Sequence, residues 1–172
     1  MREGPGGSPS SAQRATAPSS VVTIPALICA AGHASSPDRE RCRTCGAPLT
    51  GPVRTVARPL LGRLRISTGS DVDLDRTVIL GRRPRVSRVS GDDVPMLVTV
   101  PSPQQDVSRS HLEVRPEGWR VVAVDLATTN GTQLRRPGHE IVRLRAHEPV
   151  LLADGDVLDL GDGVLVRWEE TP

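Results

Sequence analysis

Residues 62–170 contain a series of ten short apolar runs separated by Gly, Pro and Asp. No stretch of this region has the 3.6-residue period of an amphipathic helix. Short runs rich in Val and Leu and joined by many turns are typical of an antiparallel β-sandwich. We therefore predict an all-β fold with a sandwich over residues 62–172. The expected strands are Gly62–Ser67, Thr77–Gly81, Met96–Val100, His111–Arg115, Trp119–Leu126, Thr132–Leu134, Ile141–Leu144, Pro149–Leu152, Val157–Leu160 and Val164–Trp168.

The first third of the chain has a different composition. Residues 1–20 are mostly Gly, Pro, Ser and Ala without apolar periodicity, which predicts a disordered tail. A segment with cysteines follows at residues 21–52, and residues 53–61 are expected to be a connector. The apolar run at 21–31 is too short to cross a membrane. No basic region precedes it, so we expect a cytoplasmic protein without a membrane partner; a poor signal peptide with a long leader is the alternative.

The composition excludes several functions. All 22 basic residues are Arg, so the chain has no phosphate-loop lysine, Schiff-base lysine or lysine general base. It contains two Trp but no Phe or Tyr. Binding of single-stranded nucleic acid by base stacking therefore has few side chains to use. The net charge of +2 gives no reason to expect a general nucleic-acid binder, so we do not expect a nucleic-acid partner.

The three cysteines and one histidine fall into two close pairs, Cys29-x3-His33 and Cys42-x2-Cys45. Three cysteines cannot all form disulfides with one another. Four sulfur and nitrogen ligands complete a tetrahedral Zn²⁺ site and leave no open position, which predicts structural zinc. The segment resembles the short zinc ribbons that precede other domains. A redox pair at Cys42 and Cys45 and unmetallated free thiols are the alternatives.

Three polar motifs lie at the ends of expected strands. They are Gly81-Arg82, then Ser108-Arg109-Ser110-His111, and finally Thr128-Thr129-Asn130-Gly131-Thr132. A guanidinium and short hydroxyls on loops fixed by a rigid sheet are suited to bind a phosphate group. In their order and positions these motifs resemble those of the forkhead-associated (FHA) domain, a phosphothreonine-binding β-sandwich, from about Gly62 to Trp168.

The resemblance implies a role for each motif residue. Arg82 and Ser108 would contact the phosphate, Thr129 would add a hydroxyl, and Arg109 could add a second cation. Asn130 would hold the main chain of the ligand. His111 would brace the loops from beneath without touching the ligand, and Gly81 and Gly131 would support the site. Taken singly, Arg82 could instead belong to a solvated basic loop, and Ser108 or Thr129-Asn130-Gly131 to an ordinary turn.

Two segments depart from the family pattern. The stretch between Arg82 and Ser108 is longer than usual, and we expect it to hold an extra loop and the strand Met96–Val100. Residues 135–138, Arg-Arg-Pro-Gly, replace the small turn that commonly follows the Asn-Gly-Thr motif. Charge is uneven as well, because residues 76–115 are net basic and residues 148–172 net acidic. We expect this separation to steer an anionic ligand to the basic end.

The leading hypothesis is a non-enzymatic adaptor in serine/threonine kinase signalling. It would bind a phosphothreonine-containing protein, which could be the kinase or its substrate. A hydrolase is disfavoured, because no nucleophile has a suitably spaced base or an open metal position. The alternative is a zinc-ribbon module that docks on nucleic acid or protein through Arg39, Arg41, Arg43 and Arg54, with the sandwich as a passive scaffold.

The N-terminal threonines suggest self-regulation. Thr16 lies in the expected tail, and Thr23 follows shortly after it. If either were phosphorylated, the tail could fold back into the pocket of its own chain at high effective concentration.

Overall fold

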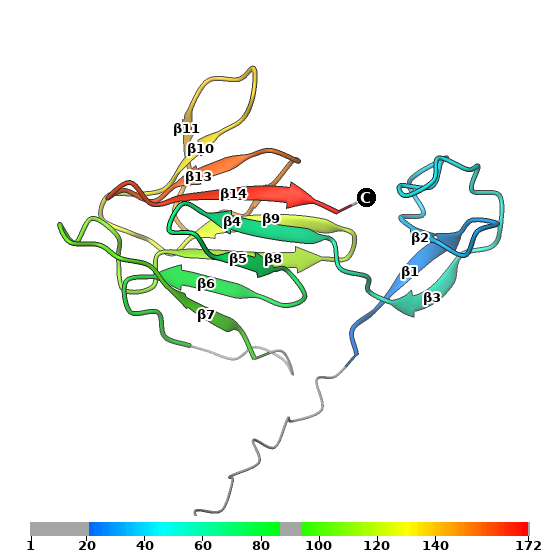
Figure 1. Cartoon of the computed structure of the whole chain (residues 1–172), viewed down its shortest axis with the longest axis horizontal. Helices are drawn as coiled ribbons and strands as arrows, with labels where there is room; N and C mark the ends of the chain where they lie inside the picture. The colour runs from blue at the N-terminus through cyan, green and yellow to red at the C-terminus, as the bar shows by residue number, and fades with distance from the viewer. Residues whose placement is uncertain (1–20, 87–93, 172) are drawn as a thin grey trace, which may run out of the picture.

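A computed structural model describes residues 21–86 and 94–171, and Figure 1 shows its arrangement. The described residues form fourteen strands and no helix. Each of the ten apolar runs predicted from the sequence overlaps a strand, which confirms the all-β fold. The expected tail and Thr16 lie outside the described residues, whereas Thr23 begins the first strand.

A small three-stranded sheet precedes the sandwich, in the order β2-β1-β3. Its strands are β1 (Thr23–Ile28), β2 (Ala34–Ser35) and β3 (Arg54–Ala57). The expected connector at residues 53–61 is therefore partly a strand, since β3 pairs antiparallel with β1. The run Arg54–Ala57 is mostly exposed and has no apolar alternation. It is therefore recognised as a strand only from its pairing with β1. We call residues 21–57 the metal module.

One sheet of the sandwich has six strands in the order β11-β10-β13-β14-β4-β5. They are β4 (Gly62–Ile66), β5 (Asp71–Asp73), β10 (Gln133–Arg135), β11 (Val142–Arg143), β13 (Val157–Asp159) and β14 (Leu165–Glu170). All neighbours in this sheet are antiparallel. Strand β5 was not predicted, because its three residues contain a single apolar side chain between two aspartates.

The second sheet has five strands in the order β12-β9-β8-β6-β7. They are β6 (Val78–Gly81), β7 (Met96–Thr99), β8 (Leu112–Glu117), β9 (Arg120–Asp125) and β12 (Val150–Leu151). One pair departs from the predicted antiparallel pattern, because β7 pairs parallel with β6. A parallel neighbour needs a long crossover, and the chain between Gly81 and Met96 is long enough to provide one.

The core lies between these two sheets and consists mainly of Leu and Val. Its fully buried members include Leu64, Leu80, Leu112 and Leu158, and Trp168 is only 3% exposed. Strand β4 alternates between this core and solvent, whereas β6 is buried along its whole length. The sheet is therefore a rigid base for the loops at its ends.

Candidate functional site

The three predicted motifs meet at one end of the sandwich. Because β6, β8 and β9 are antiparallel neighbours, the end of β6, the start of β8 and the end of β9 lie side by side. Figure 1 shows this end on the side away from the metal module. Loops that are distant in sequence are thus carried by adjacent strands.

The backbones of the first two motifs are hydrogen-bonded to each other. The Arg82 amide donates to the Ser108 carbonyl at 3.1 Å, and the Arg83 amide donates to the Arg109 carbonyl at 3.1 Å. A Cβ atom on Gly81 would lie 2.0 Å from the Arg109 carbonyl oxygen, so no other residue fits there without backbone movement. The Gly-Arg pair and the Ser108 segment are therefore locked in register.

Arg82 has an unusual environment. Its Nε is buried and has no hydrogen-bond partner among residues 21–86 and 94–171. The residue lies at an open depression of about 540 Å³, which we call the basic depression. Its other lining residues are Arg83, Thr99, Val100, Pro101, Ser102, Pro103 and Gln105. A buried N–H without an acceptor is costly, and an anionic ligand would supply one.

His111 is fully buried and connects two of the motifs. Its Nδ1 accepts a hydrogen bond from the Ser108 amide at 3.0 Å, so its proton is on Nε2, which lies 3.3 Å from the Gly131 carbonyl oxygen. Burial lowers the pKa of His111, and the nearby Asp125 carboxylate and the Gly131 carbonyl oppose this shift only in part. A neutral imidazole thus ties the Ser108 loop to the Asn130 loop.

The third motif is held by Asp125, a residue that the sequence analysis did not single out. Asp125 is 2% exposed and accepts hydrogen bonds from the Thr128 amide at 3.0 Å, the Thr128 hydroxyl at 2.9 Å and the Thr132 hydroxyl at 2.7 Å. Burial raises the pKa of this carboxyl, but the hydrogen bonds lower it by more, and the net shift is downward. The sequence feature that could have identified Asp125 is its position at the end of an apolar run, shortly before the Thr-Thr-Asn loop.

Asn130 and Thr129 are both exposed on this loop. The Asn130 amide nitrogen donates to the Asp106 carbonyl and carboxylate, each at 3.2 Å. Arg143 reaches the loop from β11, where its guanidinium lies 3.4 Å from the Thr129 carbonyl oxygen and packs where a Gly131 side chain would be. Neither contact was foreseen, since each joins segments that are far apart in sequence.

Arg82 and Asn130 line two different depressions. Asn130 lines a second depression of about 290 Å³ together with Asp106, Gln133 and Asp159, and Arg82 is absent from it. Between the two depressions runs the loop at residues 102–107. Hydrogen bonds of the Ser102 hydroxyl and the Asp106 amide to the Asp162 carboxylate fix this loop.

The expected separation of charge is wrong at this end. Asp159 and Asp162 belong to the acidic C-terminal stretch, but they lie beside the Asn130 loop and the loop at 102–107. Strand β13 brings them there, because it pairs with β10 directly after the Asn130 loop. Basic and acidic groups therefore share this end of the sandwich.

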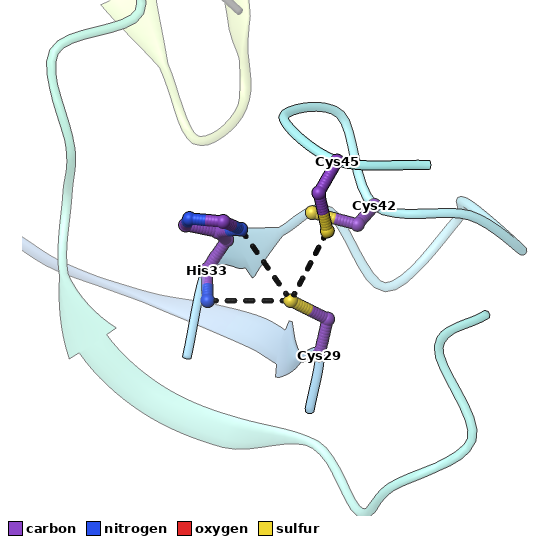
Figure 2. Close-up of side chains that lie close together, drawn as sticks. All are labelled: Cys29, His33, Cys42 and Cys45. Atoms are coloured by element: carbon purple, nitrogen blue, oxygen red, sulfur yellow. Dashed lines mark hydrogen bonds between the residues drawn. The ribbon is translucent and has the colours of Figure 1, made fainter. Parts of the chain in front are cut away.

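A second cluster lies in the metal module. Figure 2 shows Cys29, His33, Cys42 and Cys45 pointing toward one another, and their ligand atoms all lie within 4.8 Å of each other. The Cys29 Sγ is 3.8 Å from the Cys45 Sγ and 3.6 Å from the His33 Nδ1. With Zn–S bonds of about 2.3 Å and Zn–N bonds of about 2.0 Å, a tetrahedron has edges of about 3.8 and 3.5 Å. The four side chains could hold a metal ion.

The backbone prepares one thiol for this role. Burial raises the pKa of the Cys42 thiol, but the backbone amides of Cys45 and Thr44 favour the thiolate and bring the pKa down to about 5. A deprotonated sulfur is the form that binds metal.

The metal module is attached to the sandwich through Trp119 and Arg43. The Trp119 indole nitrogen donates to the Pro25 carbonyl at 2.7 Å, and the Arg43 guanidinium lies 5.9 Å from the centre of the Trp119 ring. Arg43 also donates to the Thr171 carbonyl, and Arg39 forms an ion pair with Glu170 at 3.5 Å. Two of the arginines expected to dock the module on another molecule thus contact the protein's own sandwich.

The FHA domain family model matches residues 78–161, slightly less than half of the chain. These residues run from β6 to β13 and include all three motifs. The resemblance predicted from the sequence is confirmed for this region. The comparison with curated proteins found no match.

Several solved structures are similar to the sandwich. One, from a study of phosphothreonine-dependent FHA domain interactions, is 27% identical, covers 65% of this chain and 98% of its own, and has a TM-score of 0.45. EmbR of Mycobacterium tuberculosis in complex with a low-affinity phosphopeptide is 23% identical, with 66% and 25% covered and a TM-score of 0.46. The FHA domain of CT664 from Chlamydia trachomatis is 20% identical, with 65% and 99% covered and a TM-score of 0.47.

No helix able to cross a membrane occurs in the part of the chain that the structure describes.

Proposed function

We propose that this protein is a non-enzymatic adaptor that binds a phosphothreonine-containing protein through its FHA domain. The observation that carries the proposal is Arg82. Its guanidinium lies at an open depression and has a buried N–H without an acceptor, and it forms no ion pair with any residue that the structure describes. A phosphothreonine carries a charge of about −1.5 to −2 and several strong acceptor oxygens. Such a group supplies both the missing acceptor and the missing charge.

The other motif residues are assigned by their positions. Ser108 adjoins Arg82 through the backbone hydrogen bond and would add a hydroxyl, with Arg109 beside it as a further cation. Thr129 would contribute its exposed hydroxyl from the third loop. The Asn130 amide nitrogen donates to Asp106, so its carbonyl oxygen is the group left to accept a main-chain N–H of the ligand.

Gly81, His111 and Gly131 would support the site without contacting the ligand. Gly81 permits the close approach of the Arg109 carbonyl, and His111 joins the Ser108 loop to Gly131. Loops fixed in this way bind with little loss of conformational freedom, which favours affinity.

We propose a partner that a serine/threonine kinase phosphorylates, either the kinase itself or one of its substrates. The solved structure named for phosphothreonine-dependent FHA interactions is consistent with this class of ligand. We also propose a cytoplasmic location, which is supported by the absence of a disulfide between the three cysteines, all of which the structure describes.

We also propose that Cys29, His33, Cys42 and Cys45 bind a structural Zn²⁺ in a zinc-ribbon-like knuckle. Three sulfurs and one imidazole are a donor set that zinc prefers, and four protein ligands leave no position for substrate. The metal would supply folding energy to a segment whose own apolar cluster contains little more than Leu49 and two of the cysteines.

Calorimetric titration with matched threonine, phosphothreonine and phosphoserine peptides tests the proposed function. We expect binding only to phosphorylated peptides and a loss of at least about tenfold in affinity for Arg82→Ala, because a charge-assisted hydrogen bond would be removed. Arg54→Ala is the matched control, since Arg54 is an exposed arginine on β3 at the opposite end. Equal binding of phosphorylated and unmodified peptides would refute the proposal.

A further inference from the structure

The three thiols of the metal module differ in exposure. Cys29 and Cys42 are each 5% exposed, whereas Cys45 is exposed to solvent. Oxidation of cysteine by peroxides follows the thiolate character of the sulfur and its accessibility. Because a zinc-bound cysteine is already a thiolate, accessibility decides which of the three sulfurs reacts first, and this sulfur is that of Cys45.

A second sulfur lies next to Cys45 in space. The Cys29 Sγ is 3.8 Å from the Cys45 Sγ, although 16 positions separate the two residues in the sequence. Cys29 directly follows β1, and Cys45 belongs to the tight turn at residues 42–46, which a hydrogen bond from the Gly46 amide to the Cys42 carbonyl closes at 3.0 Å. Figure 2 shows the side chains of Cys29 and Cys45 pointing toward each other. A disulfide between them would require only a small movement of the turn.

The same turn carries Arg43, which attaches the metal module to the sandwich. The Arg43 guanidinium donates to the Thr171 carbonyl and to the Leu61 carbonyl, the latter at 3.5 Å. It also lies 5.9 Å from the centre of the Trp119 ring. The backbone amide of Arg43 donates to the Ser35 hydroxyl at 3.1 Å. Since Arg43 stands between two of the four ligands in the sequence, its position depends on the shape of the turn.

The other contacts between the metal module and the sandwich are weak. The apolar core of the sandwich includes no residue of the metal module among those that the structure describes. Two ion pairs across the contact join exposed side chains at 3.5 and 3.9 Å, and pairs of this kind contribute little. They are Arg39–Glu170 and Arg120–Asp38. The attachment therefore depends largely on Arg43 and on the hydrogen bond from Trp119 to Pro25.

We propose that Cys45 is an oxidation site for hydroperoxides, where a disulfide to Cys29 forms, the bound Zn²⁺ is lost and the metal module separates from the sandwich. This inference rests on the proposed zinc site and adds a reversible step to it. Once the disulfide has formed, Cys42 and His33 are the only ligands left from the cluster, which is too few for a structural zinc ion. Without the metal, the turn loses the shape that positions Arg43.

The reaction is a two-electron oxidation of two zinc-bound thiolates. The Cys45 sulfur attacks one peroxide oxygen, the O–O bond breaks, and the other oxygen leaves as an alcohol, or as water in the case of hydrogen peroxide, after taking a proton from solvent. The Cys29 sulfur then attacks the sulfenic acid of Cys45, the S–S bond forms, and the hydroxyl leaves as water with a second proton. A dithiol reverses the reaction by exchange, after which Zn²⁺ can bind again.

Treatment of the zinc-loaded full chain with hydrogen peroxide tests the inference. A zinc indicator measures the released metal, mass spectrometry after alkylation locates the disulfide, and small-angle X-ray scattering measures the radius of gyration. We expect stoichiometric loss of zinc, a disulfide between Cys29 and Cys45, and a larger radius of gyration. A dithiol with added zinc should restore the starting state. The affinity for a phosphothreonine peptide should stay within about twofold, because the three predicted motifs lie at the other end of the sandwich (Figure 1).

Three variants identify the residues responsible. Cys45→His leaves two cysteines and two histidines, a donor set of structural zinc sites, but removes the exposed thiol, so loss of zinc should slow about tenfold or more. Cys42→His retains both Cys29 and Cys45 and should still form the disulfide. Arg43→Ala should have the larger radius of gyration without peroxide, since its contacts with the sandwich are removed.

Three outcomes would overturn the inference. They are loss of zinc no faster than in Cys45→His, a disulfide that excludes Cys29, and a radius of gyration that oxidation does not change. In each case the untreated chain still holds zinc, so the proposed zinc site stands. If the purified chain binds no zinc, the proposed zinc site fails and the inference fails with it. Location of the disulfide in the unsubstituted chain decides the assignment even if a variant fails to bind zinc.

Discussion

Replacing His111 should separate the two loops that it joins. His111 is fully buried, and its ring contacts the Ser108 amide at 3.0 Å and the Gly131 carbonyl oxygen at 3.3 Å. His111→Ala leaves both groups without partners, at about 1–3 kcal/mol each, and creates a cavity. We expect the free energy of unfolding to fall by about 3–5 kcal/mol and the affinity for a phosphothreonine peptide to fall about tenfold or more.

Two other substitutions of His111 each keep one of its two hydrogen bonds and so test the contacts separately. The Oδ1 of His111→Asn can still accept from the Ser108 amide but cannot reach Gly131. The amide of His111→Gln can donate to Gly131 but leaves Ser108 without its acceptor. Each should lose about half as much stability as the alanine variant. Urea unfolding followed by circular dichroism gives the stabilities, and calorimetry on the folded variants gives the affinities.

The protonation of His111 adds a pH dependence. Burial lowers the pKa of His111 below its ordinary value of 6.5, so the folded state keeps the imidazole neutral where the unfolded state already binds a proton. Stability should therefore fall as pH falls below about 6.5, by up to about 1.4 kcal/mol per pH unit, until the pKa of the folded state is reached. His111→Gln should lack this slope. The proposed role of His111 as a link between the two loops would be refuted if His111→Ala lost less than about 1 kcal/mol of unfolding free energy or bound the peptide normally.

Three further predictions concern the supports of the two sites. Gly81→Ala should lose about 2 kcal/mol or more and weaken peptide binding, because its Cβ would lie 2.0 Å from the Arg109 carbonyl oxygen; unchanged urea unfolding would contradict this. Asp125→Asn should lose about 2–3 kcal/mol, since its amide would face the donors of Thr128, and a normal melting curve would argue against that role. A zinc chelator should unfold residues 21–57 but leave peptide affinity unchanged, as seen by amide NMR and calorimetry; loss of peptide binding would disprove this independence.

The sequence predicted the strands of the sandwich well because their signal is local. Runs such as Gly62–Ser67 and Val164–Trp168 alternate between core and solvent, and each coincides with a strand of the fold. The signal fails where a strand depends on its partner. Residues 54–57 are mostly exposed and become β3 only by pairing with β1. The parallel direction of β7 is likewise not visible in its own residues.

The candidate sites divide in the same way. The close spacing of Cys29 and His33 and of Cys42 and Cys45 is a local pattern, and the four side chains do gather. The three FHA motifs are local as well, and the family-model match covers all of them.

Other residues at the end of the sandwich that carries the three motifs come from distant parts of the sequence. The Asn130 amide is held by Asp106, 24 residues away, and Arg143 arrives from another strand. Asp159 reaches the same end through the pairing of β13 with β10. Tertiary pairings of this kind place side chains together without any periodic trace in the sequence.

The position of Trp119 makes the protein its own optical probe. With no Tyr or Phe, near-ultraviolet emission comes from two indoles alone, one half-buried where the metal module meets the sandwich and the other, Trp168, deep in the core. Detachment of the metal module should therefore change the emission wavelength and intensity of Trp119, while the emission of Trp168 stays constant. Tryptophan fluorescence can thus follow the release of the metal module and the unfolding of the sandwich as two separate changes in one unlabelled sample.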